Sequence, residues 1–502
     1  MSLTRAVAWN TAIQVVGRLV GLAVSVALTA ILTRHLGLAD YGQFVAASGY
    51  VALFTVLGDA GIYLVAVRRA AQEPERRAEL LGTALGLRLV LAFVPLLLAF
   101  VLVQFVPTQR FPTYALTLRL VVAILAVNGY ITLLNQFLTA VFRLHLRMDL
   151  AVIGEMLARL VTLAVIGLVV LLHAGLVAAA AAFTAGTLAN FIYAWNVGRR
   201  FETFRPQLDR RLSGEMLRES VVMTAVTLLG LLHFKVDTLL LWALRPPLDV
   251  GIYGVAYKAH EVLVTFPGLF VGLLFPVFSR LAREDPMRLR QVFQRTFDVL
   301  VTTSLGAALL VFVLAPDLAA LLGGAAASRP MRILAFALPP VFVSLGFTHL
   351  LLAESRQRWL VPFYLVLVAA NVGGNLVAIQ RWSYMGAAGV TVATEGLAVV
   401  LLAGYWVQRR RMPLGPRSLL AVPLAAGLAA LGAAIFAAVP PAAGVPALVA
   451  RLAVGGTLAL GLYAAGVLVL GILPASTLRS LWPGAEADRS STAPPDGPAD
   501  GL

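Results

Sequence analysis

The sequence contains no cysteine, only 6 histidines and few charged residues. Without cysteine there can be no disulfide bond, no thiolate metal ligand and no cysteine nucleophile. Charged residues occupy 13% of the 502 positions and hydrophobic residues occupy 60%, whereas soluble domains carry about 25% charged residues. A water-soluble globular protein is therefore excluded.

Motifs that carry enzymatic chemistry are also missing from the sequence. There is no Gly-rich phosphate loop of the Walker type, no pair of histidines separated by three residues, and no Gly-x-Ser-x-Gly nucleophile elbow. The polar connections between apolar stretches are short and leave little room for a catalytic face. We therefore expect a protein that is not an enzyme and that has no metal site and no resident cofactor.

Long apolar runs make up most of the chain. A membrane-spanning helix needs about 20 mainly apolar residues, and about fourteen such stretches can be traced. The predicted spans are residues 7–33, 41–66, 81–106, 115–141, 150–172, 176–198, 219–244, 251–276, 293–315, 331–353, 359–379, 386–407, 418–438 and 447–472. The sequence thus predicts an all-α, polytopic membrane protein with about 14 transmembrane helices.

The basic residues are distributed unevenly over the connections between these spans. One alternate set of connections, together with the two termini, holds about 25 of the 39 lysines and arginines, and the opposite set holds about 7. Lysine and arginine accumulate in the cytoplasmic loops of membrane proteins. The net charge of +15 therefore indicates orientation and not binding to nucleic acid, and we expect both termini to be cytoplasmic.

The second half of the chain resembles the first half at an offset of 211 or 212 residues. This offset pairs Tyr253 with Tyr41, both followed by glycine, and Trp406 with Trp195. Six spans separate the copies, so both enter the membrane from the same side as parallel repeats. We expect two pseudo-symmetric six-helix lobes at 1–205 and 206–412, two additional C-terminal spans at 413–473, and a disordered cytoplasmic tail at 474–502.

A polar stripe follows the first predicted span. Asn10, Gln14 and Arg18 recur at every fourth residue and therefore share one face of the helix. Counted from the start of the span, Arg18 lies about 16 Å along the helix, near the membrane midplane. A charge at that depth costs at least ~2.5–3.5 kcal/mol on insertion scales. Arg18 therefore either faces a cavity, or it snorkels or pairs with a neighbouring carboxylate to hold helices together.

Other ionisable residues of the first lobe form two candidate pairs. Asp59 in the second span and Arg88 in the third lie in the same third of the membrane and could pair as a gate or as inert structural contacts. Glu155 and Arg159 lie one turn apart in the fifth span, where they could neutralise each other on the helix surface. In the fourth span Asn128 and Asn135 share a polar face that could simply hydrogen-bond to a neighbouring helix.

Five ionisable residues cluster in the seventh and eighth spans, at similar depth in the outer half of the membrane. These residues are Lys235, Asp237, Lys258, His260 and Glu261. The lysines and carboxylates either neutralise one another or leave the outer cavity positively charged. If burial shifts their pKa values, the titratable members could also carry a coupling proton.

Short motifs at the start of each lobe resemble those of bacterial oligosaccharide flippases. This family is the polysaccharide transporter branch of the multidrug/oligosaccharidyl-lipid/polysaccharide exporter superfamily. The resemblance lies in residues 34–42, with the sequence RHLGLADYG, in Gly58-Asp59-Ala60-Gly61, and in residues 249–258 of the second lobe. The resemblance implies a V-shaped pair of lobes that alternately opens a central cavity to each face of the bacterial inner membrane.

The resemblance also implies the cargo. Such flippases move a polyprenyl-pyrophosphate-linked oligosaccharide from the cytoplasmic to the outer leaflet for O-antigen, capsule or exopolysaccharide synthesis. The expected partners are this lipid, the bilayer, and polysaccharide polymerases and glycosyltransferases. The alternatives within the superfamily are a flippase for the peptidoglycan lipid precursor and a cation-coupled multidrug exporter. A membrane-embedded glycosyltransferase, polymerase or ligase is the alternative of a different class.

Candidate residues can be assigned to each part of this cargo. Cationic side chains suit the pyrophosphate, and the candidates are Arg18, Arg159, Lys235 and Lys258. Amides suit the sugar, and the candidates are Asn10, Gln14, Asn128 and Asn135. The candidates for gating or ion coupling are Asp59, Arg88, Glu155, Asp237, His260 and Glu261. Coupling to protons or to sodium ions stays open.

Overall fold

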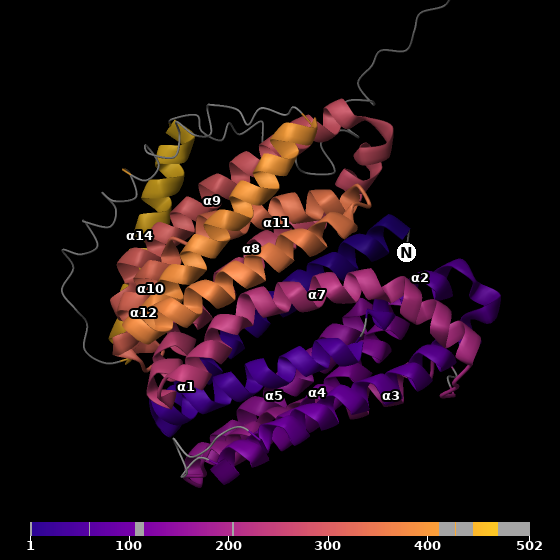
Figure 1. Cartoon of the computed structure of the whole chain (residues 1–502), viewed down its shortest axis with the longest axis horizontal. Coiled ribbons are helices and arrows are strands. Elements are labelled where there is room, and N and C mark those ends of the chain that lie inside the picture. The colour runs from indigo at the N-terminus through magenta and orange to yellow at the C-terminus, as the bar shows by residue number, and fades with distance from the viewer. Residues whose placement is uncertain are drawn as a thin grey trace, which may run out of the picture.

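The computed structural model describes residues 3–59, 61–105, 115–202, 205–410, 427 and 445–469. Within these ranges the chain is helical apart from short turns and contains no strand (Figure 1). The first group of helices comprises α1 (Leu3–Asp59), α2 (Ile62–Gln72), α3 (Arg77–Val103), α4 (Ala115–Leu144), α5 (Met148–Leu171) and α6 (Leu176–Gly198). A short 3-10 turn, η1 (Pro74–Arg76), joins α2 to α3.

The second group of helices follows after a polar connection. It comprises α7 (Arg210–Leu244), α8 (Pro247–Glu284), α9 (Pro286–Leu321), α10 (Ser328–Ala335), α11 (Leu338–Ala353), α12 (Leu360–Arg410) and α14 (Val445–Val469). Two 3-10 turns, η4 (Ala325–Ala327) and η5 (Gln357–Trp359), lie between its members. The all-α prediction is confirmed.

The helices that could cross a membrane correspond to the predicted spans wherever the structure describes the chain. Ten helices are long and apolar enough to span a membrane, and α10 with α11, bent by 50°, can form one more. Because α1 and α12 are each divided in two by a sharp break, the described residues supply thirteen crossings. The predicted span at 418–438 and the predicted tail at 474–502 lie outside the described residues. The protein is a multi-pass membrane protein.

The breaks inside α1 and α12 fall where the sequence predicts connections between spans. In α1 the break is at Gly37, whose φ of 79° is a conformation that glycine adopts without steric cost. In α12 the break is at Ser383, whose φ is 50°. The Ser383 hydroxyl donates a hydrogen bond to the carboxylate of Asp249 at the start of α8, which ties this turn to the neighbouring helix.

One predicted span is wrong in its C-terminal boundary, and another is bent. The second span was expected to run to residue 66, but it ends at Asp59 because Gly61 adopts a left-handed conformation with φ 65°. The residues that follow form the separate helix α2. The span predicted at 331–353 is two helices, because Pro339 has no N–H with which to continue the hydrogen-bond ladder from Ala335.

The connection predicted around residues 315–330 is also much shorter than expected. The preceding span was expected to end at residue 315, yet α9 continues through Pro316 to Leu321. Proline lacks the N–H that would bond to the carbonyl four residues earlier, at Phe312. The Arg332 side chain donates a hydrogen bond to that same carbonyl at 3.2 Å. A side chain from α10 therefore satisfies the acceptor that the proline leaves free.

The two groups of helices lie on opposite sides of the bundle, with α7 between them (Figure 1). They contact each other where α1 packs against α7 and α8 and where α2 and α3 pack against α7. Arg68 and Arg69 of α2 also form ion pairs with Glu219 of α7. At Gly42 in α1 and Gly251 in α8 an added Cβ would overlap a backbone carbonyl oxygen of the other helix, so the two backbones touch. We call this end of the bundle, with the turns at Gly37 and between α7 and α8, the Gly37 end. The helices diverge toward the opposite end, where α2 lies (Figure 1), and we call that the α2 end.

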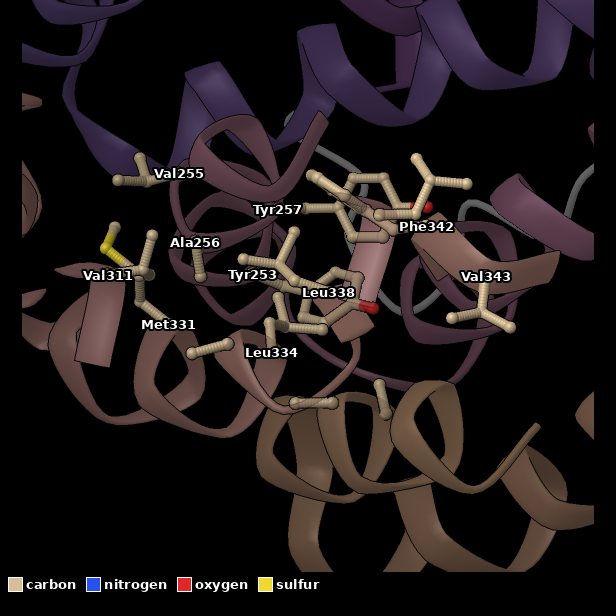
Figure 2. Packing of buried hydrophobic residues seen from close by; sticks show 14 of the residues in the cluster. Tyr253, Val255, Ala256, Tyr257, Val311, Met331, Leu334, Leu338, Phe342 and Val343 are labelled. Carbon is tan, nitrogen blue, oxygen red and sulfur yellow. The ribbon is translucent and has the colours of Figure 1, made fainter. Parts of the chain in front are cut away.

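A buried apolar cluster holds α8 against the bent helices α10 and α11. Tyr253 and Tyr257 of α8 pack in this cluster with Leu334, Leu338 and Phe342 (Figure 2). With this face of α8 fixed against its own group, residues at helical spacing on another face are directed toward α1. The packing thus positions the polar residues of α8 between the two groups.

Candidate functional site

A cavity of about 310 Å³ lies between the two groups of helices. Both segments of α1 line it, together with α6, α7 and α8. Its polar side chains are Ser25, Thr29, Tyr41, Ser48, Lys235, Thr238, Tyr257, Lys258 and Glu261. The volume is at the lower end of the ~300–1,000 Å³ typical of ligand pockets. The cavity can hold a polar head group but not a whole oligosaccharide.

Three charged side chains meet in this cavity. The Lys235 Nζ atom lies 3.4 Å from Oε1 of Glu261, and the Lys258 Nζ atom lies 3.1 Å from Oε2 of the same carboxylate. The Lys235 ammonium also lies 5.3 Å from the centre of the Tyr257 ring, within the range of a cation–π contact. Two cations thus share one carboxylate, and the three groups together carry one positive charge.

The rarity of lysine in the sequence points to this cavity, although the prediction did not use it. Lys235 and Lys258 are the only lysines in the chain, and every other member of the 39 basic residues is an arginine. Both lysines line the same cavity. Tyr41 and Ser48 of α1 were also missed, although their separation of seven residues places them on one helix face.

Lys235, Lys258 and Glu261 form a charged trio. Asp237 is not part of it, although it is two residues from Lys235. Residues two apart on a helix point to different faces. The Asp237 side chain is buried inside the second group, where it accepts hydrogen bonds from the Tyr253 hydroxyl, the backbone N–H of Thr238 and, at 3.3 Å, the Thr391 hydroxyl. These three donors leave Asp237 no contact with the cavity lysines.

The two arginines proposed for pyrophosphate binding lie outside the cavity lining. Arg159 donates a hydrogen bond to the backbone carbonyl of Gly21 at 2.8 Å and thereby links α5 to α1. Arg18 is exposed, and the preceding Gly17 lies against Val152, close to the start of α5. From Arg18 to Gly37 the helix rises about 28 Å, nearly the ~30 Å thickness of the hydrocarbon core. Arg18 therefore lies near the α2 end and not at the midplane.

The depth predicted for Arg18 was counted from residue 7, the predicted start of the first span. The helix begins at Leu3, and more than thirty residues precede the break at Gly37, whereas about 20 residues cross the bilayer. The first turns of α1 therefore extend beyond the membrane at the α2 end. The break at Gly37 is the better origin for estimating depth.

The amide candidates for sugar contacts mostly hold helices together. Asn128 donates a hydrogen bond to the Thr187 hydroxyl at 3.0 Å, and Asn135 donates to the Thr187 backbone carbonyl at 3.1 Å. Both bonds join α4 to α6 within the first group, as interhelical amides commonly do in membranes. Gln14 is half-buried in α1, and the side chain of Asn10 lies outside the described part of the structure.

The gating candidates of the first group differ in their surroundings. Asp59 and Arg88 form an ion pair, and Arg88, which is only 1% exposed, also donates to Gln136 at 3.0 Å. Glu155 is exposed and forms no ion pair with Arg159 in the described part of the chain, because the Arg159 guanidinium is directed to α1. The sequence therefore identified one real pair and one that does not form.

A second buried polar pair lies within the second group. The His233 Nε2 atom is 3.1 Å from a carboxylate oxygen of Glu395, and both side chains are almost fully buried. They line a small cavity of about 30 Å³, and Asn371 donates to the His233 carbonyl at 3.0 Å. His260 is also buried, with its ring 5.5 Å from that of Tyr257. The sequence did not predict the pairing of His233 with Glu395, which lie 162 residues apart.

Comparison with known protein families gives one match. A family model described as "Polysaccharide biosynthesis protein" matches residues 3–282. A comparison with curated protein sequences gives no match.

Solved structures of transporters share the fold of the whole bundle. The lipid II flippase MurJ in an inward closed conformation superposes with a TM-score of 0.68 at 13% identity, over 91% of this chain and 98% of that chain. An inward-facing MATE family multidrug resistance transporter of the MOP superfamily gives 0.61 at 14% identity, over 78% and 94%. A MOP superfamily transporter from Pyrococcus furiosus, described as having a binding pocket of reverse polarity, gives 0.60 at 15% identity, over 80% and 95%. The superfamily resemblance seen in the sequence is confirmed.

Proposed function

Since the chain belongs to the polysaccharide biosynthesis protein family, we propose that it is a flippase for a polyprenyl-pyrophosphate-linked oligosaccharide. The protein would move this lipid from the cytoplasmic to the outer leaflet of the bacterial inner membrane, for O-antigen, capsule or exopolysaccharide synthesis. The observation that carries the proposal is the cavity between the helix groups, which contains both lysines of the chain and a net positive charge.

The chemistry of the cavity suits a diphosphate. Ammonium groups form short, charge-assisted hydrogen bonds to phosphate oxygens, and these contacts strengthen where protein and lipid lower the local dielectric constant. The hydroxyls of Ser25 and Ser48 line the same cavity and supply neutral donors for the first sugar, while the Thr29 hydroxyl, which donates to the Ser25 carbonyl, can act as an acceptor. The polyprenyl chain, being apolar, would stay in the bilayer.

The two helix groups supply the moving parts for alternating access. We propose that they are the six-helix lobes expected at 1–205 and 206–412, with the spans of 413–473 added to them. At the Gly37 end, Arg34 donates a hydrogen bond to the Leu321 carbonyl of the other group at 2.8 Å, and Gly42 and Gly251 bring the backbones together. With both termini in the cytoplasm, this contact closes the cavity on the outer side. Cargo would then enter from the α2 end.

The peptidoglycan lipid precursor is the second candidate cargo. The likeness to the lipid II flippase extends over 91% of the chain, against 78% for the MATE transporter. Both candidate lipids carry a polyprenyl diphosphate, so the lysine-lined cavity serves either. A cation-coupled drug exporter fits less well, because the net positive charge of the trio would repel a cationic drug.

We propose that an ion gradient drives translocation and that the protein uses no resident cofactor. Coupling to a proton or sodium gradient would supply ~2.3 kcal/mol per charge per 100 mV. Asp237 and His260 are our candidates for carrying the coupled ion, because both are buried within the second group on α7 and α8, two helices that also line the cavity. Asp59 and Arg88, as an ion pair at the α2 end, are our candidates for a gate.

Translocation in vesicles tests the proposed function. The full chain is reconstituted with a short polyprenyl-pyrophosphate-linked sugar, and the lipid that becomes accessible to an external glycosidase is measured over time. We expect transport with the wild type and background flux with the Lys235→Gln, Lys258→Gln double variant. Equal rates for both proteins, each at the same reconstituted amount, would contradict the proposal. Competition with peptidoglycan precursor and oligosaccharide precursor then distinguishes the two cargoes.

A further inference from the structure

We propose that Glu261 is an internal counter-anion of the cavity. In the empty cavity its carboxylate neutralises the lysines, the diphosphate of the cargo displaces it, and its return to the lysines promotes release. The inference rests on the proposed function and adds a residue that sets both selectivity and release.

The geometry of the trio is that of a bridging anion. Each oxygen of the Glu261 carboxylate contacts a different lysine, at 3.4 Å and 3.1 Å. Lys258 precedes Glu261 by three residues on α8, while Lys235 comes from α7. A diphosphate presents oxygens on two phosphorus atoms and can bridge the same two ammonium groups. The carboxylate therefore occupies the position that a diphosphate would need.

The exposed fractions of the three side chains indicate that Glu261 is the one that can move away from the other two. The Glu261 side chain is 46% exposed, against 26% for Lys235 and 22% for Lys258. Within the described residues, the Glu261 carboxylate has hydrogen bonds to these two lysines only. It can therefore rotate away from the lysines without breaking another hydrogen bond or ion pair in the described part of the chain.

Lys235 keeps a support when Glu261 leaves. The Tyr257 ring lies beneath the Lys235 ammonium, and the Tyr257 hydroxyl donates a hydrogen bond to the Phe234 carbonyl at 2.9 Å. This bond joins α8 to α7 independently of Glu261, so the helices that carry both lysines stay together. Lys235 consequently stays directed at the cavity, and Lys258 remains in the cavity lining on α8.

The charge balance gives the carboxylate a role in selectivity. With Glu261 in place the trio has one positive charge, and without it the two lysines have two. A singly charged phosphodiester head group, as in bulk anionic lipids, offers little advantage over the carboxylate that it must displace. A diphosphate carries more charge and more acceptor oxygens, so it can displace Glu261 and neutralise both lysines. Glu261 thus restricts the cavity to multiply charged head groups.

Affinity measurements on the full chain in nanodiscs test this role. The probes are farnesyl diphosphate and farnesyl methyl phosphate, a singly charged phosphodiester, titrated by calorimetry into the wild type and Glu261→Gln. We expect Glu261→Gln to bind farnesyl diphosphate about tenfold more tightly, since removing a competing charged hydrogen bond is worth at least that factor. We also expect the preference for the diphosphate over the phosphodiester to fall in this variant. Glu261→Asp, which keeps the charge but shortens the reach, should lie between the two.

A matched control and two lysine variants separate the possible outcomes. Glu284→Gln changes an exposed glutamate at the far end of the same helix, paired only loosely with Arg280 at 3.9 Å, and should bind like the wild type. If Glu261→Gln binds no more tightly while Lys235→Gln and Lys258→Gln lose binding, the counter-anion role is overturned and the proposed function stands. If the lysine variants bind farnesyl diphosphate as the wild type does, the proposed function itself is overturned.

Discussion

Gly42 of α1 and Gly251 of α8 face each other at a contact where neither backbone leaves room for a side chain. An added Cβ on Gly42 would overlap the Pro247 carbonyl oxygen, and one on Gly251 would overlap that of Leu38. The contact joins the two helix groups at the Gly37 end, and only glycine permits so close an approach. Closure of this end therefore depends on two residues without side chains.

The first prediction concerns this contact. Gly251→Val should prevent closure at the Gly37 end, because the branched side chain forces the backbones apart. The chain has no cysteine, so Ser48→Cys places a single thiol in the cavity. We expect a membrane-impermeant maleimide added outside the cell to label this thiol faster in the Gly251→Val background.

The control for this experiment lies on the same helix. A Cβ added at Gly268 meets nothing within 4 Å, so Gly268→Val should leave the labelling rate unchanged. Equal rates in the Gly251→Val and Gly268→Val backgrounds would show that the Gly42–Gly251 contact does not close the cavity.

The Asp59–Arg88 pair gives the second prediction. Removing one partner of a buried ion pair leaves an uncompensated charge, at a cost of about 3–5 kcal/mol, with the lower value expected because Asp59 is 27% exposed. We expect Arg88→Leu to lower the free energy of unfolding, and the Asp59→Leu, Arg88→Leu double variant to recover much of the loss. Thermal unfolding of the purified proteins measures this. If both variants unfold like the wild type but lose transport, the pair is a gate and not a structural contact.

The third prediction separates the two arginines first assigned to pyrophosphate. Arg159→Ala removes a charged hydrogen bond to the Gly21 carbonyl, worth about 1.5–3 kcal/mol, and should lower stability by that amount. Arg18→Ala should leave stability unchanged, because the Arg18 side chain is exposed near the α2 end. Unfolding of both variants, compared with Glu155→Gln on the exposed face of α5, tests the assignment. If the Arg159→Ala protein is as stable as the wild type but no longer binds cargo, Arg159 contacts the cargo and its structural assignment is wrong.

The fold could be predicted well because its main signals are local. Runs of about 20 apolar residues specify spans wherever they occur, and the turns at Gly37 and Ser383 fall between predicted spans. The errors arose where distant residues decide the outcome. A helix continues through Pro316, and Arg332, sixteen residues later, bonds to the carbonyl that the proline leaves free. No pattern within α9 itself signals this.

The candidate site could be predicted only in part, for a similar reason. Lys235, Lys258 and Glu261 were found because they are charged residues inside consecutive spans, and the structure brings them together. Asn128 and Asn135 are also polar residues inside a span, but both donate hydrogen bonds to Thr187 on another helix. Whether a buried polar group faces a cavity or a neighbour depends on helix rotation, which composition does not specify.

The fourth prediction uses the rarity of lysine, and it tests the central claim most directly. Since Lys235 and Lys258 are the only lysines, reductive methylation of the full chain modifies only these two side chains and the terminal amine. We predict that farnesyl diphosphate slows methylation of both lysines, by about tenfold at saturation, and that farnesol does not. Equal methylation rates with and without farnesyl diphosphate, at concentrations where the terminal amine reacts normally, would contradict a diphosphate-binding cavity.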